Sequence, residues 1–223
     1  ELLRQIKLPL TKASMAHSIE KRIDRLESDR IDAPRHARAI AVKFPPPPHC
    51  GRVVLEVEGL TKSYSGPPVF KGLAFDLGRG ERLMVLGLNG AGKTSMLRIL
   101  AGQSSADHGS VNFGLHVSAG YFAQEHDLID PDANLVDNLR DHVNDVKEHE
   151  LRGLLGRFAL TGDKAFQPAG TLSGGEKTKL ALSMLMGGKH NLLLLDEPTN
   201  NLDPPSRTAV ADALSEWPGA IVL

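Results

Sequence analysis

The segment Gly87-Leu88-Asn89-Gly90-Ala91-Gly92-Lys93-Thr94 decides the fold of this 223-residue chain. It fits the pattern G-x-x-x-x-G-K-[ST] at every position. It follows an apolar run at 82–86, which predicts a strand, and opens a predicted helix over 93–100 that stops at Gly102. The backbone amides of such a loop curl round phosphate groups at the N-terminus of the helix. Lys93 adds a positive charge, and the Thr94 hydroxyl is a Mg²⁺ ligand, so the loop predicts a nucleoside triphosphate site.

A second motif, Leu192-Leu193-Leu194-Leu195-Asp196-Glu197, predicts a buried strand that ends in two carboxylates. A parallel strand covered on both faces is continuously apolar, and ligand groups lie at its carboxyl end. We expect Asp196 to hold Mg²⁺ through water and Glu197 to act as general base on the attacking water. The alternative is a solvated acidic turn, which the neighbouring phosphate loop disfavours.

The rest of the chain after residue 50 alternates strand and helix patterns. We expect further strands at 53–57, 70–77, 117–122 and 220–223, and helices at 135–143, 148–158, 173–186 and 204–214. This alternation predicts an α/β fold with a mostly parallel sheet. No run of 18 apolar residues occurs, so no transmembrane segment is expected.

Residues 1–50 form a separate, basic region with ten Lys and Arg against six Asp and Glu. Met15, Ile19, Ile23 and Leu26 make one apolar stripe, which predicts a helix over 11–30. The prolines at 45–48 predict an extended spacer, so we place the domain boundary there: 1–50 as a helical arm, 51–223 as the main domain. The start lacks Met, and we expect the chain to begin inside a longer protein. Cys50, the single cysteine, is interpreted as having no functional role.

The segment Leu172-Ser173-Gly174-Gly175-Glu176 lies shortly before the acidic strand. Together with the phosphate loop, it resembles the ATP-binding-cassette (ABC) ATPases over about residues 52–223. The resemblance implies a phosphate-loop core, an antiparallel β part and a small helical subdomain. In that family, Ser173, Gly174, Gly175 and Glu176 would complete the ATP site of a facing cassette. Ser173 is also a good helix cap, whose neighbouring amides suit a γ-phosphate.

The resemblance assigns further residues one at a time. Tyr64 corresponds to the aromatic that stacks on adenine, Gln124 to the glutamine that reaches Mg²⁺ and water, and Asp203 to the loop that couples the two sites. Ordinary packing for Tyr64 and a loop amide for Gln124 are the alternatives. The expected ATP-binding set is Tyr64, Gly87, Asn89, Gly90, Ala91, Gly92, Lys93, Thr94 and Ser95. The family's histidine after the strand near Ile221 has no counterpart, and His108, His126, His142 and His149 are interpreted as surface or loop residues.

The run from Asp196 to Asp203, D-E-P-T-N-N-L-D, resembles that of the ABC-F branch, twin-cassette ATPases that act on ribosomes, although Asn201 replaces the usual histidine. The segment 120–125 and the basic arm resemble this branch as well. The resemblance implies the second cassette of a cytoplasmic, ribosome-associated protein, with a first cassette upstream and an arm that meets rRNA or tRNA. Such a fragment alone would hydrolyse ATP poorly. The ATPase subunit of a membrane transporter is the alternative; a DNA-repair cassette is disfavoured, because 124–173 is too short for its coiled coil.

Overall fold

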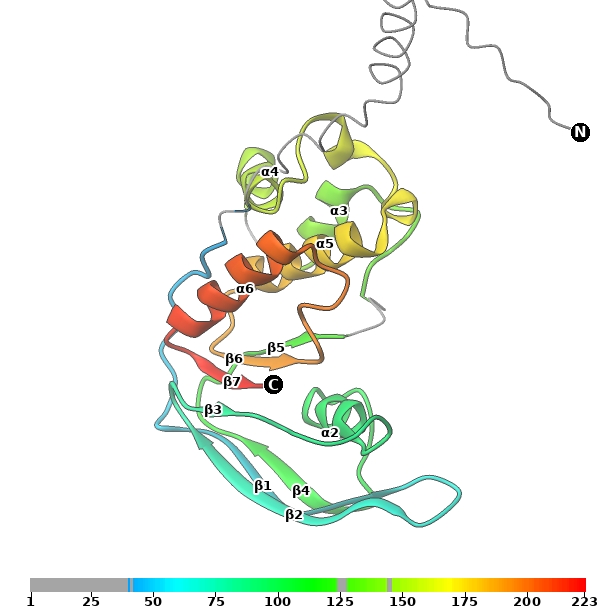
Figure 1. The fold of residues 1–223 in the computed structure, drawn as a ribbon. Coiled ribbons are helices and arrows are strands. Elements are labelled where there is room, and N and C mark those ends of the chain that lie inside the picture. The colour runs from blue at the N-terminus through cyan, green and yellow to red at the C-terminus, as the bar shows by residue number, and fades with distance from the viewer. Residues whose placement is uncertain (1–39, 41, 124–127, 144–145) are drawn as a thin grey trace, which may run out of the picture. The chain divides into compact units, whose positions relative to one another are not determined.

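The structure is a computed structural model that describes residues 40, 42–123, 128–143 and 146–223. The predicted helix at 11–30 and the predicted site residue Gln124 lie outside these ranges, as does His126. In the described part, strands and helices form two sheets with helices between and beside them (Figure 1).

The antiparallel sheet has the strand order β2-β1-β4, with β1 Val53–Ser63 at its centre, β2 Pro68–Gly78 and β4 His108–Phe113. Strands β1 and β2 extend beyond the ranges predicted for them, 53–57 and 70–77. β4 was not predicted, because its sequence H-G-S-V-N-F is mostly polar and shows no alternating apolar face. It is held in the sheet by pairing with β1, which overrides its weak propensity. His108 is exposed at its start.

The second sheet is parallel throughout, with the order β3-β7-β6-β5. Its strands are β3 Arg82–Leu83, β5 Ala119–Phe122, β6 Leu192–Leu195 and β7 Ala220–Val222. The prediction of a strand over 82–86 was wrong in length. Regular pairing of β3 with β7 stops after Leu83, and beyond it only the Val85 amide still donates a hydrogen bond, 2.6 Å long, to the Leu223 carbonyl.

The apolar strand β6 is buried on both faces, as predicted. Leu192 and Leu194 pack in a cluster with α2 (Lys93–Leu100) and β1, whereas Leu193 and Leu195 pack with the helices on the other side. Each fully buried leucine stabilises the fold by roughly 1.5–3 kcal/mol. The carboxyl end of this strand is therefore held firmly, and the position of the residues that follow it is well defined.

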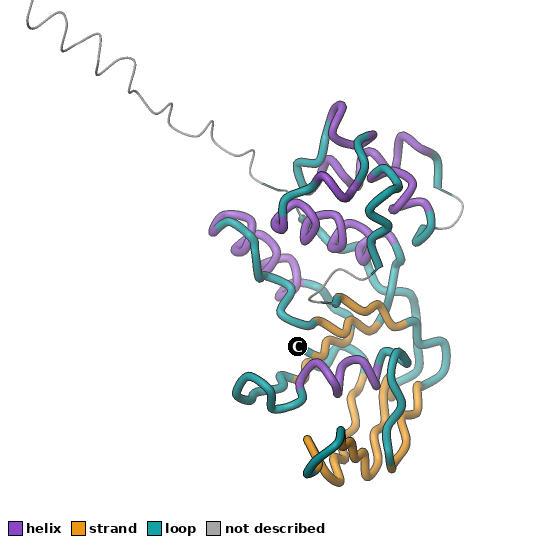
Figure 2. The backbone as a smooth tube through the Cα atoms, turned by 90° about the vertical axis from the view of Figure 1, so that its right-hand side faces the viewer, coloured by secondary structure: helices purple, strands orange, loops and turns teal. Residues whose placement is uncertain are grey.

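The remaining helices surround α5, Gly174–Gly187. They are α3 Leu135–Arg140, α4 Glu148–Arg157 and α6 Pro204–Glu216, with 3-10 turns η1 Gly162–Phe166 and η2 Ala169–Thr171 before α5. Figure 2 shows these helices gathered on one side of the strands, whereas α2 lies between the two sheets. They form the small helical subdomain implied by the resemblance, and the predicted α/β fold class is confirmed. None of the helices in the described ranges has both the length and the apolar composition needed to span a membrane.

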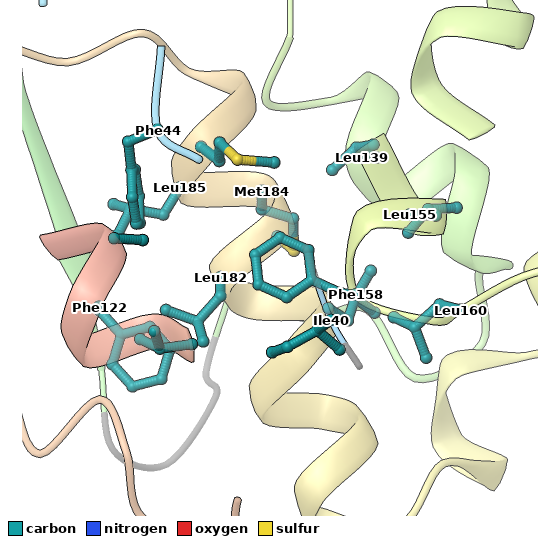
Figure 3. Close-up of a cluster of buried hydrophobic side chains, with 14 of the residues drawn as sticks. Ile40, Phe44, Phe122, Leu139, Leu155, Phe158, Leu160, Leu182, Met184 and Leu185 are labelled. Atoms are coloured by element: carbon teal, nitrogen blue, oxygen red, sulfur yellow. The ribbon is translucent and has the colours of Figure 1, made fainter. Parts of the chain in front are cut away.

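Residues that precede β1 pack onto the helices of the main domain. Ile40 and Phe44 are buried in the cluster that contains Phe158 and Leu182 (Figure 3). The Trp217 indole N–H donates a hydrogen bond of 2.8 Å to the carbonyl of Pro45. The compact unit that contains both sheets begins at Ala39, whereas the sequence suggests a boundary at the Pro-rich segment that follows.

Candidate functional site

The loop from Gly87 to Thr94 connects β3 to α2, and its shape requires glycine. Gly90 and Gly92 have φ angles of 83° and 92°, in the left-handed region. A Cβ atom on Gly92 would lie 2.3 Å from Cγ1 of Val69 on β2. Gly92 caps α2 without a side-chain hydrogen bond, and no acidic residue occupies the first turn. The N-terminal amides of α2 and its positive dipole end are thus suited to an anion.

A pocket of about 380 Å³ opens at this loop. Polar surface predominates in it, unlike in the apolar cavity beside β5. Its lining comes from three separate parts of the chain: the β1–β2 connection, the phosphate loop with α2, and the turn after β6. The lining residues are Tyr64, Val69, Asn89, Gly90, Gly92, Lys93, Thr94, Ser95 and Glu197.

The Lys93 ammonium lies inside the curve of the loop. Nζ donates hydrogen bonds to the carbonyls of Gly87, at 2.9 Å, and Leu88, at 3.2 Å. These carbonyls are weak partners compared with a phosphate, which carries full negative charge. A phosphate in the pocket can therefore replace these carbonyls as the hydrogen-bond partner of the Lys93 ammonium group.

Tyr64 stands at the rim of the pocket, directly after β1. Its hydroxyl donates to Oγ of Ser95 at 3.1 Å, and its side chain is 54% exposed. The Lys62 ammonium lies 5.2 Å from the ring centroid and 3.3 Å from Oδ1 of Asp107. The hydrogen bond from the Ser63 amide to Asp107 lowers the pKa of that carboxyl group. Neither Lys62 nor Asp107 was predicted, because they are 45 positions apart and meet only through the pairing of β1 and β4.

The two acidic residues after β6 have different surroundings. Asp196 is only 3% exposed, its amide donates to the Phe122 carbonyl at 3.0 Å, and its Oδ2 atom has no hydrogen-bond partner within the described ranges. Glu197 is exposed, lines the pocket and has a φ angle of +51°, which is unusual for a residue with a side chain. The solvated-turn interpretation therefore does not describe Asp196.

The turn after Glu197 folds back on itself. The Asn200 amide donates to the Glu197 carbonyl at 3.1 Å, and Nδ2 of Asn200 donates to Oε2 of Glu197. Asn201 also has a positive φ angle, 63°, and its carbonyl lies against α5 at Gly175. Asn200 was not predicted as a site residue, although its position three residues after Glu197 is that expected for a turn contact.

The segment 172–176 lies at the start of α5. Ser173 and Glu176 form a capping box, in which each side chain accepts the other's backbone amide. The Lys164 ammonium also donates to the Glu176 carboxylate. This hydrogen bond, together with those from Ser173, lowers the pKa of Glu176 to about 2.

Asp203 caps α6 in a similar manner. Its carboxylate accepts from the Ser206 amide and hydroxyl, at 3.2 and 2.7 Å, and from the Lys179 ammonium at 3.1 Å. These partners, Ser206 first, lower the pKa of Asp203 to about 2. Because Lys179 belongs to α5, the ion pair joins the start of α6 to the helix that follows segment 172–176.

The structure thus brings most of the predicted ATP-binding residues and Glu197 around one pocket. Gly87 and Ala91 belong to the same loop but do not line the pocket, and Asp196 borders an adjoining cavity with Lys93 and Glu197. Ser173, Gly174, Gly175, Glu176 and Asp203 lie outside it.

Comparison with known proteins identifies the family. The model of the family described as "ABC transporter" matches residues 70–200, a range that contains the phosphate loop, the segment 172–176 and Glu197. The chain belongs to this family. It is an ATP-binding cassette, and its fold matches the ATP-binding cassette MJ0796 in a dimeric, post-hydrolysis state bound to ADP and Pi. That match has a TM-score of 0.65 over 75% of this chain and 86% of that one, and its 20% identity supports the fold alone.

Two curated relatives of this cassette are informative. The uncharacterised ABC transporter ATP-binding protein YkpA of Bacillus subtilis is 35% identical over 100% of the chain. The ABC transporter F family member 5 of Arabidopsis thaliana is 32% identical over 93% of it. The chain spans 42% and 30% of the length of these relatives, respectively, so both are considerably longer than this sequence.

Proposed function

We propose that this cassette binds Mg-ATP in the pocket around Lys93 and hydrolyses it with Glu197 as general base. The observation that carries the proposal is that Lys93 and Thr94 share a 380 Å³ pocket with Glu197, which comes from a distant part of the chain. The loop and Lys93 bind phosphates, Tyr64 offers an exposed ring at the rim for a base, and Glu197 accepts a proton from water.

The residues beside the pocket suit Mg²⁺. A buried carboxylate oxygen without a hydrogen bond is costly unless a cation or water meets it, and Oδ2 of Asp196 is such an atom. Thr94 adds a hydroxyl oxygen, and oxygen ligands are those that Mg²⁺ prefers. Gln124 completes the proposed set. When bound, the ion would neutralise charge on the phosphate oxygens.

We further propose that the chain is the second cassette of an ABC-F protein, that residues 1–50 belong to the linker between its cassettes, and that the whole protein acts on ribosomes. The F family relative and its greater length support the branch and a second cassette. Segment 172–176 of each cassette would then complete the ATP site of the other. The excess of basic residues in 1–50 supports a polyanionic partner, rRNA or tRNA.

Single-turnover hydrolysis by the full-length protein that carries this chain tests the ATPase proposal. The Glu197→Gln variant should bind ATP normally, but its turnover should slow by about a hundredfold or more, the loss expected for a general base. Glu56→Gln, on an exposed position of β1, is the matched control and should keep the normal rate. Equal rates for the Glu197→Gln variant and the unmodified protein would contradict the proposal.

Co-sedimentation of the ATP-trapped full-length protein with ribosomes, at several salt concentrations, tests the partner. Replacing Lys21, Arg22 and Arg25 by Ala should weaken binding and flatten its salt dependence, because each phosphate contact releases counterions. ATP binding should be unaffected. Recovery with membrane proteins instead of ribosomes would favour the transporter alternative.

A further inference from the structure

We propose that Asn200 is a positioning residue that orients the Glu197 carboxylate and ties it to helix α5. The proposal rests on the function proposed for Glu197 and adds a residue to that site. It follows from contacts on both sides of the turn that begins after β6.

On the first side, Asn200 holds Glu197 twice. Its backbone amide donates to the Glu197 carbonyl at 3.1 Å, and its side-chain amide donates to Oε2 of the Glu197 carboxylate. An exposed carboxylate normally samples several rotamers, and ordering one costs conformational entropy. The Asn200 donor selects one carboxylate position before any ligand arrives, which is the preorganisation that catalysis by a general base requires.

On the other side, α5 holds Asn200. The Thr178 hydroxyl, on a residue only 1% exposed, lies 3.3 Å from the Asn200 carbonyl and 3.1 Å from that of Gly174. Next to it, the Asn201 carbonyl approaches Gly175 so closely that a Cβ atom there would lie 2.6 Å away. The backbone of the turn is thus seated on the first turns of α5.

These contacts explain why an exposed side-chain hydrogen bond matters here. Between two freely moving surface groups, such a bond contributes little. Here the Asn200 backbone is fixed by a buried residue of α5, and Glu197 is fixed by the end of the buried strand β6. The side-chain bond therefore links two rigid elements. A shift of α5, whose N-terminal segment 172–176 is proposed to meet the ATP of the facing cassette, moves the donor that orients Glu197.

The sharpest test is Asn200→Asp in the full-length protein. Aspartate has the same size and an equal tendency to form turns, but it replaces the N–H donor by a carboxylate oxygen that repels Glu197. Single-turnover hydrolysis at saturating Mg-ATP should slow about tenfold or more, the effect of losing one hydrogen bond to a charged group, while the Kd for ATP changes by less than about twofold. Asn200→Ala should slow it less, and Thr178→Val should also slow it by loosening the turn.

Two controls separate positioning from a general structural role. Thr199→Ala, in the same turn, changes a side chain that lies outside the ATP pocket and should keep the normal rate. In a Glu197→Gln background, Asn200→Asp should cause no further slowing, because the group that it orients is already lost. A role in folding alone would lower the rate additively and reduce ATP binding as well.

A measurement without turnover checks the contact itself. In NMR spectra of this chain, the side-chain amide signals of Asn200 should shift in the Glu197→Ala variant and stay in place in the Glu56→Ala variant. Unchanged signals, or an Asn200→Asp protein with the normal rate while Glu197→Gln is inactive, would overturn the proposal and leave the ATPase assignment standing. If Glu197→Gln itself retains the normal rate, both proposals fail.

Discussion

The helices α2 and α5 both begin at glycine-rich turns, but their N-termini are completed in opposite ways. Helix α2 follows Gly92, which has no side chain to offer, and its first turn contains no acidic residue. Helix α5 follows Ser173, and its capping box with Glu176 occupies two of the N-terminal donors, the backbone amides of Ser173 and Glu176. Among the residues that the structure describes, the cation near α2, Lys93, is bound only to loop carbonyls, whereas the cation near α5, Lys164, is bound to a carboxylate.

This difference separates a site prepared for an anion from one already satisfied. At α2, a phosphate finds unsatisfied amides, a positive helix end and an ammonium group that loses only weak partners. At α5, the internal carboxylate of Glu176 takes the place that an external anion would occupy. A γ-phosphate that approaches α5 must therefore use the Ser173 hydroxyl and the remaining amides, or displace Glu176. The contrast predicts that the site at the start of α2 binds nucleotide without a partner. The start of α5 is expected to contact a phosphate only when a facing cassette supplies it.

The largest expected effect that tests this contrast is on nucleotide affinity. Lys93→Ala should weaken Mg-ATP binding by roughly tenfold to a hundredfold, because one charge-assisted interaction with the phosphates is lost. Calorimetry on this chain measures it. Lys71→Ala, at an exposed position of β2, and Lys164→Ala, beside α5, should each change the affinity for Mg-ATP by less than about twofold. An equal loss from Lys164→Ala would contradict the contrast.

The next effect concerns the two neighbouring glycines at the start of α5. Gly175→Ala should lower the free energy of unfolding by roughly 1–3 kcal/mol, because its Cβ atom would meet the Asn201 carbonyl at 2.6 Å and the backbone must move. Gly174→Ala is the matched control, since its Cβ atom would have no neighbour closer than 3.9 Å and alanine favours helix. Urea unfolding compares the two. Equal stability of both variants would show that the turn is not seated on α5 as described.

A smaller effect is expected at the cap itself. Ser173→Ala should lower the free energy of unfolding by about 1 kcal/mol, the usual cost of losing an N-cap side chain. ATP binding to this chain should not change, because Ser173 lies outside the pocket. Ser110→Ala, on the exposed edge strand β4, provides the control. Reduced ATP affinity in Ser173→Ala would indicate that the two helix starts are coupled within one cassette.

The sequence predicted the elements whose local pattern and global role agree. Helix α2 has the predicted bounds, because glycines flank it on both sides: the amides of Gly102 and Gln103 close its C-terminus onto the carbonyls of Ile99 and Arg98. Strand β6 also has the predicted bounds, because four leucines between polar residues suit only a doubly buried strand.

The remainder depends on contacts between distant residues, which a single sequence does not display. β4 exists because β1 is beside it, and β3 is short because β7 pairs with only two of its residues. The partners of the predicted carboxylates come from elsewhere too: Lys164 precedes Glu176 by twelve positions, and Lys179 precedes Asp203 by 24. Motif spacing predicts a candidate catalytic set, whereas the contacts of its members with distant residues are seen only in the folded chain.

The smallest expected effect is the pH dependence contributed by the α5 cap. The pKa of Glu176 is lowered from 4.5 to about 2 in the folded chain, first by the hydrogen bond from Lys164. A lowered pKa means that the ionised carboxylate stabilises the fold above about pH 4.5, and that this contribution is lost as the pH falls toward 2. In Glu176→Gln, the free energy of unfolding should therefore decline less steeply over this range than in the unmodified chain.

The effect should be modest, because both partners of the ion pair remain partly open to solvent, with side chains 27% and 40% exposed. Lys164→Met provides the decisive comparison. It keeps the carboxylate but removes the main cause of the lowered pKa, so the pH dependence should flatten in the same direction as in Glu176→Gln. Urea unfolding between pH 6 and 3 measures all three proteins. A different outcome is that Lys164→Met keeps the pH dependence of the unmodified chain while Glu176→Gln flattens it. In that case the Ser173 amide and hydroxyl alone stabilise the Glu176 carboxylate, and the cap of α5 needs no cation from outside the helix.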